Sequence, residues 1–360
     1  MLMLNQIYEF KTDADPIFIT KFGNGHINDT YLVVDATARQ YILQKINKTV
    51  FHKPDEVMAN VKAVLDYLKK NTNQRQKSLS LVPAKSGLDW HVDESGEYWR
   101  LYYFISDTIC LQKAESFDDF KESGVAFGNF QNALADFPAD TLYETILNFH
   151  DTPNRFKRFN EVLKADPQGR AKSAAREIEF ALEREAYAGK LISLHEEGSI
   201  PLRVTHNDTK LTNVLFDRYT RKSVCVVDLD TVMPGLSVHD FGDSIRFGAS
   251  TASEDETDLS KVQLSMELFK AYTSGYLSSS METLTVAEFF HLRDGAKMMT
   301  LECGLRFLTD YLEGDVYFKV HRDGHNLDRC RTQFKLVEEM ESKWDEMQKI
   351  IIAENNYGRK

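Results

Sequence analysis

Four polar residues near the middle of the chain have the types and spacing that phosphoryl transfer requires. Asp208 and Lys210 lie in the segment THNDTKLTN, Asn213 closes it, and Asp228 follows after an apolar stretch. Phosphoryl transfer has a loose transition state, so a protein mainly positions groups and supplies positive charge. The order Asp, Lys, Asn, Asp predicts Asp208 as the base, Lys210 as a catalytic contact to the transferred phosphate, and Asn213 and Asp228 as ligands of Mg²⁺ on ATP.

The elements around these residues should bring the two magnesium ligands together. Residues 214–216 and 223–227 have the apolar, β-branched pattern of two short strands, and residues 217–222 between them are polar and turn-like. A hairpin returns its second strand to the start of its first. Asn213 enters this hairpin and Asp228 leaves it, so we expect them side by side. The alternative is a polar loop whose side chains only cap its neighbours.

Other polar residues lie close to this segment in sequence. Asp230 follows Asp228 by two positions and is expected on the same side, near the metal or the acceptor. The run DFGD at 240–243 is like the metal-binding signature of protein kinases, but Asp228 already fills that position. We therefore expect Asp240 to bind backbone amides of residues 205–213, the predicted catalytic segment, or to cap the next helix. His206 is expected to be a buried scaffold residue.

The N-terminal part of the chain has the pattern of a sheet with one helix. Strands are expected at residues 16–21, 29–34, 40–45, 79–82, 89–92 and 98–105, and a helix at 53–70. Three strands, one helix and further strands is the order of a kinase small lobe.

The rest of the chain is predicted to be mainly helical. Helices are expected at residues 117–136, from 152, at 174–194, at 260–276, from 285, and along a final apolar stripe from 334 to 351. The sequence therefore predicts an α+β, protein-kinase-like bilobal fold. Residues 1–105 would form a small, mixed β-sheet lobe that binds ATP. Residues 106–360 would form a larger, mainly helical lobe that carries the catalytic and sugar-binding residues.

Three N-terminal segments are candidates for nucleotide binding. The loop Gly23, Asn24, Gly25, His26, Ile27 and Asn28 could let backbone amides approach phosphate oxygens, although a plain hairpin turn is the alternative. The strand at 40–45 stands where kinases carry a phosphate-binding lysine. Alternation puts Gln44 rather than Lys45 on the expected face, unless a bulge shifts the register. Phe104 and Ile105, at the end of the last strand, are expected to border the adenine.

A helical segment near residue 300 supplies candidates for acceptor binding. Glu302 and Arg306 are four residues apart, so they could form an intrahelical ion pair, or Arg306 could bind acceptor hydroxyls in the cleft. The segment that follows contains Tyr311, Asp315 and Tyr317, a polar and aromatic composition expected of a sugar pocket.

The composition restricts the possible partners and environment. A net charge of −11 argues against nucleic acid or an anionic membrane as a partner. The four cysteines are far apart, with no CxxC pair, which predicts reduced thiols in a cytoplasmic protein and neither a zinc site nor a disulfide framework. We find no apolar run of membrane-spanning length and no signal-peptide pattern. The sequence does not indicate an oligomeric state.

These motifs together resemble those of a known family. HNDTKLTN with the later DLD resembles the aminoglycoside phosphotransferase and choline kinase-like family, and DFGDSIRFGAST and RFLTDYLEGDVYF are similar to its N-acetylhexosamine 1-kinase branch. The resemblance implies ATP- and Mg²⁺-dependent phosphorylation of N-acetylglucosamine or N-acetylgalactosamine at the C1 hydroxyl. It implies Arg306, Tyr317 and His26, besides Asp208 and Asp230, as substrate contacts. It also implies that Gln44 is tolerated in place of a basic residue.

Two other functions stay open from the sequence. The first is kinase activity on another small-molecule hydroxyl, such as choline, an aminoglycoside or an amino-alcohol. A cationic acceptor needs an aromatic cage or clustered carboxylates, and the three tryptophans are not near the candidate site in sequence. The second is a nucleotide-binding regulatory module without turnover. Gln44 favours that module, whereas the intact Asp208, Asn213 and Asp228 argue against it.

Overall fold

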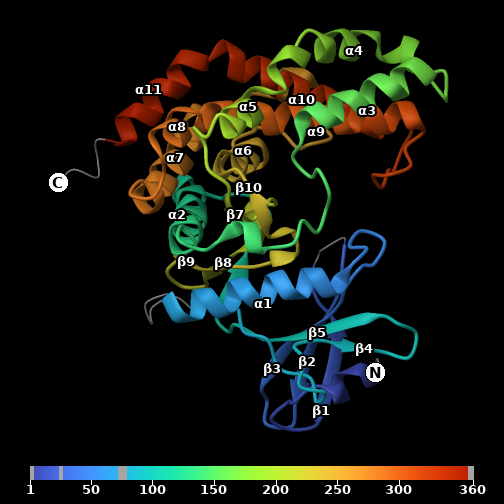
Figure 1. Ribbon diagram of the computed structural model, residues 1–360, viewed down its shortest axis with the longest axis vertical. Helices are drawn as coiled ribbons and strands as arrows, with labels where there is room; N and C mark the ends of the chain where they lie inside the picture. Colours follow the sequence, from blue (N-terminus) through green and yellow to red (C-terminus); the bar gives the residue numbers. More distant parts are fainter. Residues whose placement is uncertain (1–3, 24–26, 72–78, 356–360) are drawn as a thin grey trace.

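The computed structural model describes residues 4–23, 27–71 and 79–355 and has a small N-terminal lobe and a larger C-terminal lobe (Figure 1). The N-terminal lobe contains a five-stranded sheet in the order β1-β2-β3-β5-β4. Its strands pair antiparallel and span β1 Pro16–Lys21, β2 Asp29–Asp35, β3 Gln40–Lys45, β4 His91–Val92 and β5 Tyr98–Tyr103. The order predicted for a kinase small lobe is therefore present.

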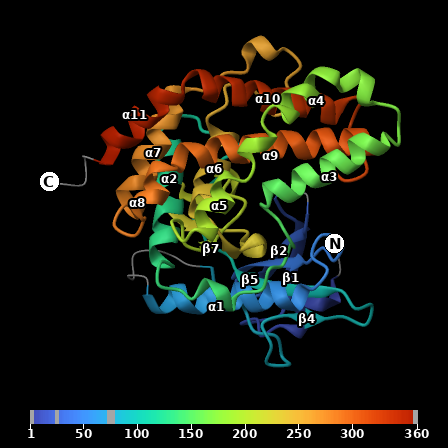
Figure 2. The ribbon, with the colours of Figure 1, turned by 45° about the horizontal axis from the view of Figure 1, so that its top comes forward.

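The long helix α1 (Pro54–Asn71) lies between this sheet and the C-terminal lobe (Figures 1 and 2). Its Val57, Val61 and Val64 recur at helical spacing and are buried. On the side of the C-terminal lobe, the Asn60 amide donates to the carbonyl oxygens of Tyr143 (2.8 Å) and Val232 (2.9 Å). The helix therefore ties the two lobes together through both apolar and polar contacts.

Parts of the N-terminal lobe differ from the prediction. Residues 79–82 run along β5 but contribute one isolated bridge, Leu81 to Tyr102, rather than a strand. Pro83 follows at once and has no N–H to extend a ladder. The predicted strands at 89–92 and 98–105 are shorter in the structure, as β4 has only His91–Val92 and β5 ends at Tyr103.

The C-terminal lobe is mainly helical and contains two small sheets. Its α-helices are α2 Phe117–Ala133, α3 Thr152–Ala165, α4 Ala175–Leu182, α5 Lys190–Glu196, α6 Ser237–Gly248, α7 Met266–Ser280, α8 Val286–Phe290, α9 Leu292–Glu313, α10 His325–Ser342 and α11 Trp344–Asn355. One sheet pairs β7 (Arg203–Thr205) with β10 (Met233–Gly235), and the other orders β6 (Thr108–Cys110), β8 (Val214–Asp217) and β9 (Ser223–Val226) as β6-β8-β9. Helix α9 is buried along most of its length and lies beside α3 and α10 (Figures 1 and 2).

Several predicted helices have different bounds in the structure: α2 ends at Ala133 rather than 136, and larger differences occur at three other places. The segment 174–194 breaks into α4 and α5 around a 3₁₀ turn at Glu185–Tyr187. Helix α7 begins at Met266 rather than 260, because the Ser265 hydroxyl caps it. The apolar stripe from 334 to 351 runs over two helices that part at Lys343, although its Met340 and Met347 are both buried as predicted.

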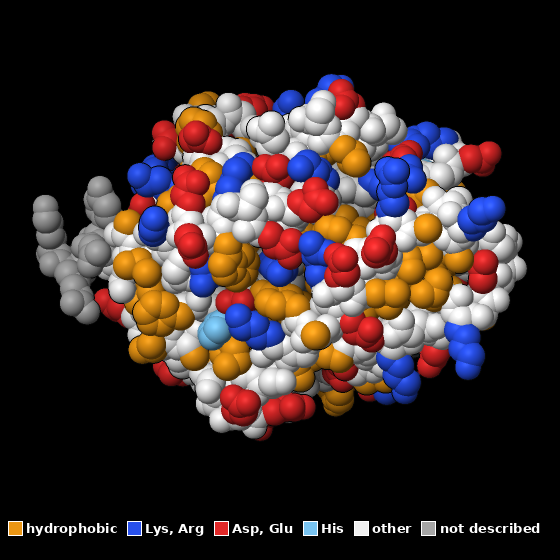
Figure 3. All heavy atoms as spheres, turned by 90° about the horizontal axis from the view of Figure 1, so that it is seen from above, with side chains coloured by type: hydrophobic (Ala, Val, Ile, Leu, Met, Phe, Trp, Pro, Cys, Tyr) orange, Lys and Arg blue, Asp and Glu red, His pale blue; other side chains and the backbone are white. Residues whose placement is uncertain are grey.

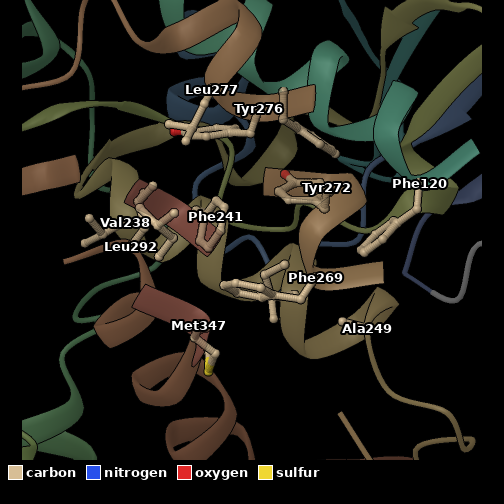
Figure 4. Close-up of a cluster of buried hydrophobic side chains, with 14 of the residues drawn as sticks. Phe120, Val238, Phe241, Ala249, Phe269, Tyr272, Tyr276, Leu277, Leu292 and Met347 are labelled. Atoms are coloured by element: carbon tan, nitrogen blue, oxygen red, sulfur yellow. The ribbon is translucent and has the colours of Figure 1, made fainter. Parts of the chain in front are cut away.

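An aromatic core fixes helix α6 beneath the catalytic segment. The ring of Phe241 meets the rings of Phe269, Tyr272 and Tyr276 edge-on, at centroid distances of 6.2, 5.6 and 5.4 Å. Figure 4 shows Phe241 among these side chains of α7. Such pairs stabilise a core beyond their buried area. The phenylalanine of the DFGD run is therefore a core anchor, and it holds the neighbouring aspartates in place.

Helices α6 and α9 approach each other closely through two glycines. A Cβ atom on Gly242 would lie 2.2 Å from the carbonyl oxygen of Gly295, and one on Gly295 would lie 1.9 Å from that of Val238. We expect Gly242→Ala to lower the free energy of unfolding by about 1–3 kcal/mol, because overpacking outweighs the gain in helix propensity. Thermal denaturation would measure the change.

Gly189 provides the matched control for this prediction. It has a helical backbone conformation, and its added Cβ would meet only the Ser193 hydroxyl at 3.9 Å. Gly189 is the N-cap residue of α5, where Ala is less favourable than Gly, but the loss of unfolded-state entropy offsets this, so Gly189→Ala should change the melting temperature only slightly. Equal melting temperatures for the two variants would contradict the proposed tight contact.

The face of the C-terminal lobe seen in Figure 3 has acidic and basic side chains interspersed, with apolar groups between them. On this face the negative net charge is not gathered into one patch. Among the helices of residues 4–23, 27–71 and 79–355, none combines the length and apolarity needed to cross a membrane.

Candidate active site

The predicted hairpin brings Asn213 and Asp228 together. Strands β8 and β9 pair with Val214 opposite Val226, and the N–H of Val227 donates to the carbonyl of Asn213 at 2.9 Å. Asn213 therefore enters the hairpin directly beside the point where Asp228 leaves it. Asn213 and Asp228, which are 15 residues apart, meet because the turn at 217–222 lets the two strands pair as a hairpin.

Asp208 is held between Lys210 and Asn213. The Lys210 ammonium lies 2.7 Å from Oδ1 of Asp208, and the Asn213 amide donates to Oδ2 at 3.0 Å and to the Asp208 carbonyl at 2.8 Å. Burial by itself would raise the pKa of Asp208, but the charge and hydrogen bond of Lys210 outweigh it and lower the pKa. Asp208 is therefore ionised at neutral pH and able to accept a hydrogen bond from an acceptor hydroxyl.

Asp228 has a different environment. Within the described residues, its carboxylate has no hydrogen-bond or ion-pair partner. The side chain is in contact with solvent, but the protein atoms around the carboxylate remove part of its hydration. This desolvation, together with the negative charges of Asp230 and Asp208, raises the pKa of Asp228 to about 6. Its backbone is left-handed, with φ 62° and ψ 62°, a conformation that Asp tolerates better than most residues and that clusters at functional sites.

The arrangement fits a magnesium ion held partly by phosphates. The amide nitrogen of Asn213 is used by Asp208, which leaves its amide oxygen for a cation, and Asp228 offers an unpartnered carboxylate. Among the residues that the structure describes, no three His, Cys, Asp or Glu side chains form a complete metal cage. Magnesium characteristically takes one or two protein ligands and completes its shell with phosphate oxygens and water.

Two buried residues hold the catalytic segment in this position. Asp240 accepts the backbone N–H groups of His206 and Asn207, each at 2.8 Å, which confirms the prediction that it binds amides of this segment. His206 is fully buried, as expected. Its Nε2 lies 2.9 Å from the carbonyl of Val227, and its Nδ1 accepts the N–H of Asp208 at 3.3 Å, so we assign the proton to Nε2. His206 thereby links the chain at Asp208 to the chain before Asp228.

The N-terminal lobe contributes an arginine that the sequence reasoning missed. Gln44 is half-buried and accepts from Nε of Arg100 at 3.0 Å, whereas the Lys45 ammonium lies 3.4 Å from the Glu97 carboxylate. Arg100 forms an ion pair with Asp230, whose other oxygen accepts from the Asn28 amide at 2.6 Å. An arginine in the apolar strand YWRLYY was the available signal, because charged residues are rarely buried without a partner.

The remaining nucleotide candidates lie at the join between the lobes. Gly23 has a left-handed backbone (φ 77°), and Ile27 is exposed; Asn24, Gly25 and His26 lie outside the described residues. Phe104 follows β5, donates its N–H to Gln40 at 3.1 Å and meets the ring of Phe22 edge-on. The carbonyl of Ile105 accepts the Thr108 hydroxyl at 2.7 Å. Phe104 and Ile105 therefore belong to the segment that connects the N-terminal sheet to β6.

Comparison with known proteins agrees with this geometry. Residues 19–275 match the phosphotransferase enzyme family, APH. The chain belongs to this family. The predicted family and the kinase-like α+β fold are thereby confirmed.

Solved structures of other phosphotransferases share the fold over nearly the whole chain. A microcompartment-associated aminopropanol kinase has 17% identity and a TM-score of 0.63, covering 96% of this chain and 97% of its own. Amicoumacin kinase hAmiN, solved with AMP-PNP, Ca²⁺ and Ami, has 12% identity and a TM-score of 0.64, with coverage of 93% and 92%. Choline kinase from Cryptosporidium parvum Iowa II has 13% identity and a TM-score of 0.52, with coverage of 95% and 93%.

A second cluster of this phosphotransferase surrounds Arg306 of α9. The guanidinium carbon of Arg306 lies 5.7 Å from the ring centroid of Phe149, 5.8 Å from that of Tyr317 and 5.4 Å from that of Phe318. Burial lowers the pKa of Arg155, and the positive charge of the nearby Arg306 lowers it further. The cluster therefore combines positive charge with aromatic faces.

Glu302 belongs to a neighbouring hydrogen-bond network rather than to an ion pair with Arg306. It accepts from His150 at 2.9 Å and from the Thr152 hydroxyl at 2.7 Å. These bonds overcome the effect of burial and lower its pKa to about 2. The other ring nitrogen of His150 lies 3.4 Å from the carbonyl of Asn207, next to Asp208. His150 thus connects α9 to the catalytic segment, a contact that no local sequence pattern indicated.

The loop that carries Tyr317 is fixed by Asp310. This carboxylate accepts the backbone N–H groups of Val316, Tyr317 and Phe318 at 2.9, 2.7 and 2.9 Å. The other predicted pocket residues make structural contacts: Tyr311 bonds Ser173, and Asp315 pairs with Arg170 at 2.6 Å. Asp310 therefore orders the loop, and Tyr317 is the exposed aromatic group that it presents.

Proposed function

We propose that this phosphotransferase transfers the γ-phosphoryl group of ATP to the C1 hydroxyl of an N-acetylhexosamine. The observation that carries the proposal is the position of the Arg306 cluster beside the Asp208 segment, joined to it through His150. A guanidinium only donates hydrogen bonds, so its partner must be an acceptor oxygen such as a sugar hydroxyl or an N-acetyl carbonyl.

The same cluster disfavours a cationic acceptor. Choline and amino-alcohols carry a positive charge, and two arginines, Arg155 and Arg306, lie together at this position. Their charges would repel such a substrate, whereas a neutral sugar can pack on the exposed ring of Tyr317. The resemblance of the segment RFLTDYLEGDVYF to hexosamine kinases supports the same choice.

In this proposal Asp208 orients the acceptor hydroxyl and receives its proton as the oxygen attacks the γ-phosphorus and ADP leaves. An anomeric hydroxyl is more acidic than other sugar hydroxyls, so a carboxylate with a lowered pKa suffices. Lys210 turns its charge from Asp208 toward the transferred group, where charge develops. Asn213 and Asp228 would hold Mg²⁺, which when bound neutralises charge on the phosphates.

The nucleotide is proposed to lie where the lobes join. Phe104 and Ile105 would border the adenine, and Gly23, Ile27 and Asn28, with Gln44 behind them, would face the phosphates. We propose that the boundary between an ATP-binding lobe (1–105) and a catalytic and sugar-binding lobe (106–360) lies directly after Ile105. We also propose a cytoplasmic location, where ATP is available and the four thiols stay reduced.

The acceptor assignment is tested by measuring ADP release with Mg²⁺ and a panel of N-acetylglucosamine, N-acetylgalactosamine, choline, an amino-alcohol and an aminoglycoside. A 1-O-methyl glycoside should bind without reacting, because its C1 oxygen is blocked. Phosphorus NMR of the product should show coupling to the anomeric proton. A phosphate on C6, or turnover with choline and not with a hexosamine, would exclude the proposal.

Replacing Arg306 is expected to weaken the sugar selectively. Arg306→Ala removes a charged hydrogen-bond donor that typically contributes about 1.5–3 kcal/mol, so the KM for the sugar should rise about 10–100-fold while the KM for ATP changes little. Steady-state kinetics with each substrate varied in turn would measure both values. Arg306→Lys keeps the charge but loses the planar arrangement of hydrogen-bond donors, so its KM for the sugar should lie between those of the unaltered protein and of Arg306→Ala. An equal rise in both KM values would place Arg306 outside the sugar site.

A further inference from the structure

A cluster of polar side chains, built on a buried ion pair, joins the two lobes next to the proposed metal ligands. We call Arg100, Asp230, Gln44 and Asn28 the interlobe clasp. Arg100 is 1% exposed and Asp230 3% exposed. Arg100 forms an ion pair with Oδ1 of Asp230, and the Asn28 amide donates to Oδ2 at 2.6 Å. Three of these residues come from the N-terminal lobe and Asp230 from the C-terminal lobe, so the clasp forms only when the lobes meet.

Stability alone does not account for a buried ion pair of this kind. Taking two charges out of water carries a large desolvation penalty, and apolar residues of similar volume often give an equally stable or more stable protein. Removing one partner, by contrast, leaves an uncompensated buried charge. The pair therefore makes one relative position of the lobes much more favourable than others, which is a means of fixing geometry.

The position that the clasp fixes contains the nucleotide-binding elements. Asp230 and Asp228 share the 3₁₀ turn at Leu229–Thr231, for which Asp228 is the N-terminal cap residue. Asn28 ends the loop proposed to face the phosphates, and its side-chain oxygen accepts the N–H of Asn47 at 3.0 Å. One carboxylate thus connects the metal-binding turn to the phosphate loop.

The clasp also places a positive charge where the third strand lacks one. Gln44 and Arg100 are direct partners across β3 and β5, and the Gln44 amide, which donates to Thr30 at 3.0 Å, accepts from Nε of Arg100. Lys45 pairs with Glu97 on the other face of the strand. The cation therefore comes from the neighbouring strand, and Gln44 orients it.

We propose that Arg100 and Asp230 are positioning residues for the Mg²⁺-nucleotide, which keep the Asp228 turn in register with the phosphate loop. This inference rests on the proposed kinase function and assigns Asp230 to the nucleotide side of the site rather than to the acceptor. Outer partners of metal ligands typically change metal affinity or activity by about 10–100-fold when they are replaced. The clasp should therefore act on the nucleotide and the metal, and not on the sugar.

The test uses Asp230→Asn, Arg100→Met and the double variant, with Mg²⁺-ADP affinity measured by calorimetry and KM values for ATP and sugar measured by kinetics. We expect each single variant to weaken Mg²⁺-ADP about 10–100-fold and to change the KM for the sugar less than about twofold. The double variant removes both charges, so its melting temperature should recover toward that of the unaltered protein while its nucleotide affinity stays low.

Lys45→Met is the matched control, because it removes a cation one residue from Gln44 on the opposite face of the same strand. It should bind Mg²⁺-ADP as the unaltered protein does. If the double variant regained nucleotide affinity together with its stability, the clasp would be only structural. A selective rise in the KM for the sugar in Asp230→Asn would likewise overturn the inference. If a single variant fails to fold, the same comparison of Mg²⁺-ADP affinity with the KM for the sugar can be made with Arg100→Lys and with the double variant.

Failure of this inference can be told apart from failure of the proposed acceptor. Calorimetry with Mg²⁺-ADP needs no sugar, so a protein that binds the nucleotide through the clasp but phosphorylates no hexosamine would keep the inference and lose the acceptor. An unaltered protein that binds no Mg²⁺-ADP at all would overturn both.

Discussion

Asp208→Asn is expected to lower kcat by about 10²–10⁴-fold with little change in the affinity for ATP. The substitution keeps the size of the side chain, so packing against the catalytic segment is preserved. It removes the negative charge that lies 2.7 Å from the Lys210 ammonium. It also replaces one carboxylate oxygen by an amide nitrogen, so the side chain can no longer accept a proton at neutral pH. Steady-state kinetics and nucleotide binding, measured on the same preparation, would separate the two effects.

A result near the normal turnover would rule out Asp208 as the base. A loss of nucleotide affinity equal to the loss of kcat would instead indicate that Asp208 acts on the phosphates. A melting temperature close to that of the unaltered protein is needed for either conclusion, because Asp208 also accepts the Asn213 amide that lies beside the hairpin.

Asp228→Ala is expected to reduce kcat/KM by about 10³-fold or more, since electrostatic stabilisation by a bound metal contributes several kcal/mol. Within the described residues Asp228 is the carboxylate of this site without a protein partner, as Lys210 pairs with Asp208 and Arg100 with Asp230. Its removal should therefore raise the Mg²⁺ concentration needed for activity and cost little stability. A titration of activity with Mg²⁺ would measure this change.

Asp240→Asn is the control for this second prediction. Asp240 accepts two backbone amides and the Gln131 side chain, so an amide in its place cannot satisfy all three donors. It should lower the melting temperature, because each unsatisfied buried donor costs about 1–3 kcal/mol, with the Mg²⁺ requirement unchanged. A structure with an ATP analogue and Mg²⁺ in which neither Asn213 nor Asp228 coordinates the metal would refute the metal assignment.

The distribution of charge gives the two halves of the site separate tasks. Around the proposed metal position, the three carboxylates of Asp208, Asp228 and Asp230 face two cations, Lys210 and Arg100, an arrangement that favours a divalent ion. At the proposed acceptor position, Arg155 and Arg306 lie together among aromatic rings. This contrast is why we favour a neutral, oxygen-rich acceptor over the cationic substrates named for several proteins of the same fold.

Local order in the chain was enough to predict that two of the candidate site residues lie side by side. Asn213 and Asp228 meet because a short hairpin joins them, and a hairpin needs only its two strand patterns and a turn. The prediction that Asp240 binds backbone amides followed from assigning the metal role to Asp228. The early strands β1 and β3 have the predicted bounds, because each is a short, mainly apolar run of the kind that forms strands locally.

Contacts between distant segments were decided only by the tertiary structure. Arg100 contacts Asp230, and Arg306 contacts Phe149, although each pair is more than 100 residues apart and no helix or strand pattern links them. From the sequence alone, Arg306 was therefore equally suited to an ion pair with Glu302. The predicted helices at 174–194 and 334–351 each break in the structure, at the 3₁₀ turn Glu185–Tyr187 and near Lys343, and the apolar pattern of the sequence marked neither break. The sequence by itself determined which groups could perform the chemistry, whereas the fold decided which charges neutralise one another, because burial makes the energy of each charge depend on its nearest partner.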